Sequence, residues 1–279
     1  MQDEEINMQN PEQPAPEEKE PEKRDEDFLS YRFGNLQGIG NRESQQDAFA
    51  FSDIFDAENV RNNGALAVVA DGMGGLADGK LAADTGVSVL RQDFAHFNTE
   101  NNIAEQLNDA MDHACSEVAK AVNGKGGCTA IAAVVFNNRL YYSSAGDSFI
   151  YLKRGELLTR LNRPHNILTD VLAELVSDGC MDPAEAVFYD KPVALSEFLG
   201  KYPLGKHDYF KRPLRLRYGD VVLICTDGVG GVLDEETIGS CLSADTPMAM
   251  CSALEEKIQA EQKRYQDNYT ALIIQCVYK

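Results

Sequence analysis

Positive charge is scarce in this chain of 279 residues, which has 26 Lys and Arg against 45 Asp and Glu. The formal net charge of −19 argues against nucleic acids and anionic membrane surfaces as partners, because both are bound through clustered cationic side chains. No apolar run reaches the roughly 18 residues that a membrane helix needs. The first residues have neither the basic flank nor the apolar core of a secretory signal, so we expect none.

The seven cysteines do not suggest a disulfide framework or a zinc site. They are scattered and odd in number, and no CxxC or CxH spacing occurs among them. Cys225 and Cys276 lie inside apolar runs. This pattern predicts reduced thiols in the core of a cytoplasmic protein.

Residues 1–27 differ in composition from the rest of the chain. They contain eleven acidic and three basic residues, four prolines and few large apolar side chains. Such a segment buries too little apolar surface to offset the entropy of folding, so we predict a disordered acidic tail. Residues 28–279 are then the folded domain.

Apolar periodicity predicts a mixture of short strands and amphipathic helices in residues 28–279. The predicted helices cover 79–96, 103–122 and 247–264, and the predicted strands cover 66–70, 128–136, 139–144 and 271–277. Asn137 and Asn138 between two of these strands are typical of a tight hairpin turn. Residues 162–212 are less regular, with helices expected at 170–177 and 183–189, and we interpret this segment as a flap beside a site. His165 in the flap is interpreted as an ordinary polar loop residue.

Several aspartates stand where an apolar strand meets a loop. The four clearest are Asp71, Asp147, Asp227 and Asp267, and Asp47 lies at the entrance of another strand. Carboxylates and backbone carbonyls are the ligands that Mg²⁺ and Mn²⁺ prefer, so these aspartates are candidates for a metal centre. The alternative is five unrelated turn residues, since Asp-Gly is a common turn signal, and spacing alone leaves both possibilities open.

Six short motifs resemble, in order and rough spacing, those of the metal-dependent protein Ser/Thr phosphatases of type 2C. The motifs are Arg42-x3-Gln46-Asp47-Ala48, Val69-Ala70-Asp71-Gly72-Met73-Gly74-Gly75, Gly127-Cys128-Thr129-Ala130, Ala145-Gly146-Asp147-Ser148, Cys225-Thr226-Asp227-Gly228 and Asp267-Asn268-x-Thr270. The resemblance spans about residues 31–277. It implies an α+β fold, a four-layer α-β-β-α sandwich of two antiparallel sheets flanked by helix pairs. It also implies a catalytic domain at 28–279.

The resemblance implies a binuclear Mn²⁺ or Mg²⁺ centre at one end of the sandwich. Asp71 would bridge both ions, and the Gly72 carbonyl would bind one of them. Asp227 and Asp267 would complete the coordination of the first ion, and the Asp47 carboxylate would contact the centre through a water molecule. The reaction implied is hydrolysis of phosphoserine and phosphothreonine by a metal-activated water.

Further roles and two departures follow from the same resemblance. Asp147 matches the ligand of a third, weaker metal, and Arg42 matches the arginine that holds the substrate phosphate. Gln46 stands where many members have Glu, which removes a negative charge near the metals. Met73 stands where many eukaryotic members have a proton-donating His, which points to a bacterial-type member without that acid.

The implied partners are phosphoproteins that a Ser/Thr kinase has modified. The enzyme is expected to be a monomer and to act in signal transduction. Three other functions stay open from the sequence. The chain could be a small-molecule phosphomonoesterase with the same metals, a catalytically silent module that binds phosphoproteins, or a structural protein whose aspartates cap turns.

Overall fold

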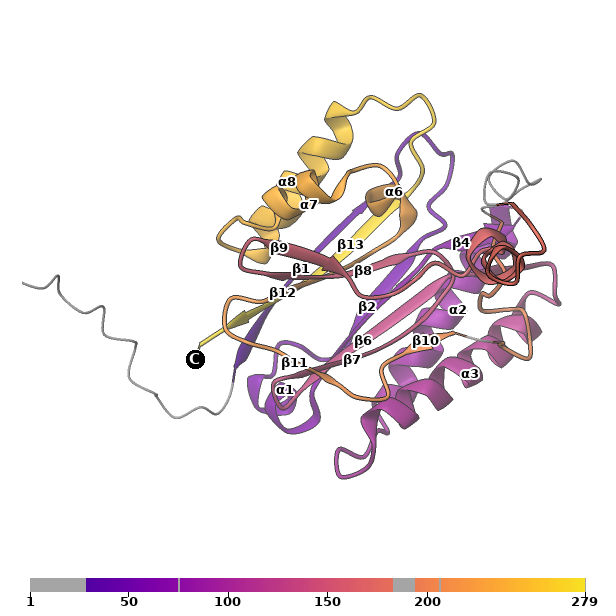
Figure 1. Cartoon of the computed structure of the whole chain (residues 1–279). Coiled ribbons are helices and arrows are strands. Elements are labelled where there is room, and N and C mark those ends of the chain that lie inside the picture. Colours follow the sequence, from indigo (N-terminus) through magenta and orange to yellow (C-terminus); the bar gives the residue numbers. More distant parts are fainter. Residues whose placement is uncertain (1–28, 75, 183–193, 206, 279) are drawn as a thin grey trace, which may run out of the picture.

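Two antiparallel sheets lie face to face between two pairs of helices in the computed structural model of the chain (Figure 1). The structure describes residues 29–74, 76–182, 194–205 and 207–278. The predicted tail at 1–27 and the predicted helix at 183–189 lie outside these residues. The predicted α-β-β-α sandwich is confirmed.

The first sheet has five strands in the order β1-β13-β12-β8-β9. They are β1 (Ser30–Gly38), β13 (Tyr269–Val277), β12 (Val221–Cys225), β8 (Phe149–Arg154) and β9 (Leu157–Arg160). The second sheet has the order β10-β7-β6-β3-β2, and β11 pairs with β7. These strands are β10 (Asp208–Tyr209), β7 (Arg139–Ala145), β6 (Ala130–Phe136), β3 (Ala65–Ala70), β2 (Ala48–Phe51) and β11 (Leu214–Arg215).

Helices cover the outer face of each sheet. The second sheet packs against α2 (Leu76–Phe94) and α3 (Ile103–Ala121), and the first against α7 (Glu235–Cys241) and α8 (Pro247–Ala260) (Figure 1). Smaller elements are α1 (Ala57–Asn63), a π-helical turn at Leu168–Leu172, α4 (Ala173–Ser177), α6 (Asp227–Gly230) and the pair β4 (Gly72–Gly74) and β5 (Gly126–Cys128). No helix in the described residues is both long enough and apolar enough to cross a bilayer.

Strand β3 shows how the layers are held together. All six of its residues are fully buried. Ala65, Ala67 and Val69 belong to the core between the two sheets, whereas Leu66, Val68 and Ala70 belong to the core under α2 and α3. Burial on both faces explains why the sequence shows a continuous apolar run here and no alternation.

Most predicted elements match the structure within a few residues, including the hairpin between β6 and β7. Asn137 and Asn138 both have positive φ, 48° and 56°, as a two-residue hairpin turn requires. The predicted strand at 128–136 is divided, however. Thr129 donates its amide to the Asp71 carbonyl at 2.9 Å, so β6 starts only at Ala130 and Cys128 pairs within β5 instead.

Candidate active site

Asp71 lies between β3 and β4 and is held there by its own backbone. Its amide donates to Thr129 Oγ1 at 3.0 Å, and its carbonyl accepts from the Thr129 amide at 2.9 Å. The next residue, Gly72, has no room for a side chain, because a Cβ would lie 2.2 Å from the Gly79 carbonyl oxygen of α2. The glycine therefore lets α2 pack directly against the turn that carries Asp71.

Asp227 follows β12 in the same way, on the other sheet. The Thr226 amide donates to the Thr270 carbonyl at 3.0 Å, and the Thr270 amide donates back to Thr226 Oγ1 at 3.0 Å. A Cβ on Gly228 would lie 1.9 Å from the Asn268 carbonyl oxygen. Both Asp-Gly pairs are thus close-packed turns at strand ends, one on each sheet.

Asp47 is fully buried and is held by the threonines next to the Asp227 turn. Its Oδ2 accepts hydrogen bonds from Thr226 Oγ1 at 2.9 Å and Thr270 Oγ1 at 2.7 Å. Its Oδ1 is buried and has no hydrogen-bond partner among the described residues. Burial, with help from Asp227 and Asp267, raises the pKa of this carboxyl to about 6, although the two threonine hydroxyls oppose the rise.

Asp71 and Asp227 share this crowded environment. Burial raises the pKa of Asp71 well above its ordinary value, and repulsion from Asp47 and Asp227 adds to the rise. Burial also raises the pKa of Asp227, while a hydrogen bond from the Asp71 carboxyl favours its ionised form. Asp227 Oδ1 is another buried oxygen without a partner in the described part of the chain. The structure therefore brings together carboxyls that destabilise one another's charge.

Asp267 and Arg42 lie at the solvent side of this group. Arg42 Nη2 is 2.5 Å from Asp267 Oδ2, and more than half of the Arg42 side chain is exposed. Arg42 also acts to lower the pKa of Asp227. The predicted phosphate-binding arginine is thus beside the predicted metal ligands, and it is paired with one of them.

Asp147 stands somewhat apart, in the turn between β7 and β8. Burial and repulsion from Asp227 raise its pKa to about 6, and Arg160 opposes this rise. Its assignment as the ligand of a third ion stays a prediction.

The donor set fits hard divalent cations. It offers carboxylate oxygens, two of them buried without partners, and repulsion that a cation would remove. Within the described ranges, no three His, Cys, Asp or Glu side chains are grouped as closely as the ligands of a bound ion. The ligand assignments themselves therefore remain predictions.

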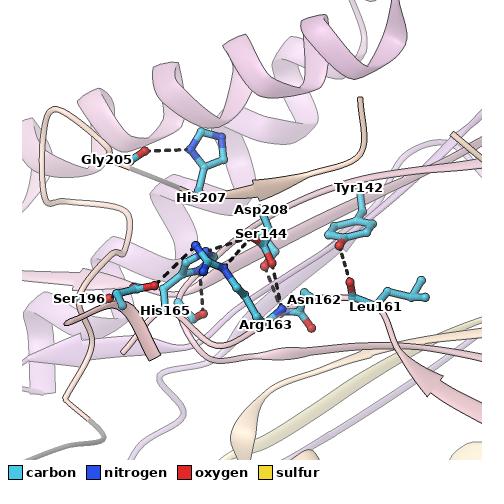
Figure 2. A network of polar contacts seen from close by, with 12 residues as sticks. Tyr142, Ser144, Leu161, Asn162, Arg163, His165, Ser196, Gly205, His207 and Asp208 are labelled. Carbon is cyan, nitrogen blue, oxygen red and sulfur yellow. Dashed lines mark hydrogen bonds and ion pairs between the residues drawn. The ribbon is translucent and has the colours of Figure 1, made fainter. Parts of the chain in front are cut away.

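The sequence interpretation of His165 as an ordinary polar loop residue is wrong (Figure 2). Its side chain is fully buried. Its amide donates to the Gly146 carbonyl at 2.9 Å, its Nδ1 lies 3.2 Å from the same oxygen, and its Nε2 lies 3.6 Å from Asp208 Oδ1. His165 thus holds the residue that precedes Asp147. A single histidine in an irregular stretch carries no signal from which this contact could be predicted.

Two threonines were also given no role in the sequence interpretation. Thr226 and Thr270 anchor Asp47 from the ends of β12 and β13. Both belong to the motifs quoted above, so their position next to Asp227 and Asp267 was the available signal. Their hydroxyls leave one Asp47 oxygen bound and the other free to face the site.

A family model described as "Protein phosphatase 2C" matches residues 31–170, half of the chain. The chain belongs to the protein phosphatase 2C family. The serine/threonine phosphatase stp of Listeria monocytogenes is 25% identical over 230 residues, which cover 77% of this chain and 86% of the relative.

Solved structures share the 2C fold. The phosphatase PstP/Ppp of Mycobacterium tuberculosis has a TM-score of 0.72 at 23% identity, covering 90% of this chain and 100% of that one. The catalytic domain of PstP in complex with two manganese ions has a TM-score of 0.69 at 24% identity, with coverage of 90% and 100%.

The two departures from the common 2C pattern lie next to Asp71. The Gln46 amide donates to Asn268 Oδ1 at 2.8 Å, which ties the Asp47 segment to the Asp267 segment. Met73 lies on β4 opposite Gly127 of β5. A thioether donates no proton, so Met73 supplies no acid to the leaving group.

Proposed function

We propose that this 2C phosphatase hydrolyses phosphoserine and phosphothreonine in proteins with the help of Mn²⁺ or Mg²⁺. The observation that supports it best is the group of buried and half-buried carboxyls with raised pKa values at the strand ends of both sheets, beside Arg42. A protein tolerates such a group chiefly where a ligand compensates it. Family membership gives the class of that ligand and of the substrate.

Two ions would be held by Asp71, the Gly72 carbonyl, Asp227 and Asp267. A third would be held by Asp147. Bound ions of this type lower the pKa of water and polarise phosphoryl oxygens. The catalytic domain of PstP, which shares this fold, forms a complex with two manganese ions, and this supports the same number for the present chain.

The protein's own groups would do three things. Arg42 would donate hydrogen bonds to phosphate oxygens, for which it must leave Asp267. Asp267 would release Arg42 for this role if it served as a metal ligand, because its negative charge would then be compensated. The Asp47 carboxyl, whose pKa burial raises to about 6, is ionised at neutral pH. Its Oδ1 has no partner in the described part of the chain and can accept a proton from water.

The test compares hydrolysis of a phosphothreonine peptide and of a sugar phosphate, each with Mn²⁺ and after EDTA. We expect metal-dependent release of phosphate from the peptide at a higher kcat/KM. Preference for the sugar phosphate would indicate a small-molecule phosphatase instead. Full activity after EDTA would contradict the metal-dependent mechanism.

We further propose that the enzyme works as a cytoplasmic monomer on proteins phosphorylated by a Ser/Thr kinase. All seven cysteines are free and six are buried, which suits a reducing compartment. Light scattering coupled to size-exclusion chromatography tests the monomer. A mass corresponding to two chains would contradict it.

A further inference from the structure

A cavity of about 610 Å³ opens at the end of the five-stranded sheet that is opposite to Asp227. The strand β12 begins beside this cavity at Val221, and its other end leads to Asp227. In Figure 1 the chain's C-terminus lies at the left, and α6 lies toward the upper right. The cavity is therefore separate from the candidate active site.

The floor of the cavity is a row of side chains across four strands. Arg32 of β1 is opposite Gln275 of β13, which is opposite Val221 of β12, which is opposite Lys153 of β8. Directly opposed residues project from the same face of a sheet, so these four side chains share the face toward α8. Three strand spacings separate the two cationic residues, about 14 Å.

Lys153 is a buried cation at one end of this row. The residue is only 9% exposed, and its Nζ donates to the Gly155 carbonyl at 2.7 Å in a partly buried hydrogen bond. Among the described residues, no carboxylate lies within ion-pair distance of it. A buried ammonium group without an opposite charge is unfavourable, so this position favours an anion.

Gln275 lies in the same row, on the other side of Val221 from Lys153. Its Nε2 donates to the Asp245 carbonyl at 3.2 Å, and its Oε1 has almost no accessible surface. Gln275 therefore forms part of the floor of the cavity, and its Oε1 is not open to a ligand there.

An aromatic surface and two carboxylates complete the cavity. Tyr218 and Tyr278 stack in parallel, with centroids 4.3 Å apart and an interplanar angle of 6°, and they are 59% and 71% exposed. Glu156 and Asp245 also line the cavity. Exposed aromatic faces bind planar rings, and carboxylates accept hydrogen bonds from sugar hydroxyls.

We propose that this cavity binds a nucleoside 5′-phosphate. The phosphate pairs with Lys153, the base extends the tyrosine stack, and the ribose hydroxyls donate to Glu156 or Asp245. The volume suits a ligand of this size. An inorganic anion would satisfy Lys153 alone, and an uncharged aromatic molecule would satisfy only the tyrosines.

The test is calorimetric titration of the full chain with AMP in EDTA, where metal ions hold no phosphate at the candidate active site. We expect one saturable site with a Kd of about 1 mM or tighter. Lys153→Met should weaken binding by about tenfold or more, and Tyr218→Ala by severalfold. Adenosine and inorganic phosphate should each bind at least about tenfold more weakly than AMP.

Matched controls separate this cavity from other charged or aromatic surface. Lys120→Met and Phe55→Ala remove an exposed lysine and an exposed aromatic ring outside the cavity and should leave AMP binding unchanged. Arg42→Ala should also leave it unchanged, whereas loss in that variant would place the ligand at the active site. Melting temperatures verify the folding of each variant. If Lys153→Met does not fold, Tyr218→Ala tests the proposal instead, because Tyr218 is exposed and its removal should not affect folding.

Three outcomes would overturn the proposal. The first is no saturable AMP binding at millimolar concentrations. The second is unchanged binding in both Lys153→Met and Tyr218→Ala. The third is inorganic phosphate binding as tightly as AMP, which would mean a simple anion site.

Discussion

Asp220 and Asp227 flank the same strand, β12, and their surroundings are opposite. Asp220 is buried, and its carboxylate accepts from Arg154 Nε at 2.9 Å, Arg154 Nη2 at 2.7 Å and the Arg217 amide at 2.8 Å. Asp227 is half-buried beside other carboxyls, has a buried Oδ1 without a partner among the described residues and has a raised pKa. One end of the strand has a complete set of partners, and the other end lacks one.

The difference shows which aspartates stabilise the fold and which are kept for a ligand. A carboxylate with a bidentate arginine and a backbone donor has its desolvation compensated within the protein. The carboxyls around Asp227 depend on something from outside for the same compensation. Substitutions at the two ends should therefore change different properties of the protein.

The largest expected effect is on activity, from Asp71→Asn and Asp227→Asn. Each should lower kcat/KM for Mn²⁺-dependent hydrolysis of p-nitrophenyl phosphate by at least about 10³-fold, because each removes a proposed metal ligand. The melting temperature of the metal-free protein should be unchanged or higher, since repulsion is relieved. A variant with wild-type kinetics would remove its residue from the proposed centre.

The second largest effect is on stability, from Asp220→Ala. It should lower the free energy of unfolding by about 2–4 kcal/mol, because it leaves Arg154 and the Arg217 amide without their acceptor. The partial exposure of Arg154 keeps the loss below that of a fully buried pair. Urea denaturation measures it, and kcat of the folded fraction should not change. A loss of activity at full stability would contradict the contrast between the two ends.

Asp47→Asn should change the free energy of unfolding in the opposite direction to Asp220→Ala, by raising it. Burial raises the pKa of Asp47 to about 6, so its ionisation destabilises the metal-free fold at pH 7. An amide keeps an oxygen for the hydroxyls of Thr226 and Thr270 and removes the charge. The free energy of unfolding should rise by about 1–3 kcal/mol without metal, while Mn²⁺ affinity falls. A less stable metal-free variant would contradict the repulsion argument.

The smallest effect is a pH dependence of the metal-free protein. The carboxyls of Asp47 and Asp147 have pKa values near 6 when folded, above their ordinary value of 3.8, so the folded state holds more protons between pH 4 and 6. Stability should therefore fall as pH rises through this window, by about 2 kcal/mol per group between pH 4 and pH 6. Urea titrations of the wild type and the Asp47→Asn, Asp147→Asn double variant measure it. If the free energy of unfolding depended on pH equally in both proteins, Asp47 and Asp147 would not be the source of the pH dependence.

Much of the fold was predictable because burial dominates the pattern of the sequence. The apolar run at 66–70 predicts a fully buried strand, and β3, which begins one residue earlier at Ala65, is such a strand. Asn137 and Asn138 predict their turn because few residues accept positive φ. The end of the strand at Thr129 was not predictable, because it depends on a hydrogen bond to Asp71, far away in the sequence.

The sequence by itself determined where most strands and helices lie, since apolar periodicity is a local property of the chain, and its six motifs indicated the layers and the chemistry through their resemblance to the 2C family. Only the tertiary structure decided which carboxylates receive partners. Asp220 meets Arg154, Asp47 meets two threonines with one oxygen, and His165 is enclosed against Gly146. These contacts join residues that are distant along the chain, and burial gives each a different energetic consequence.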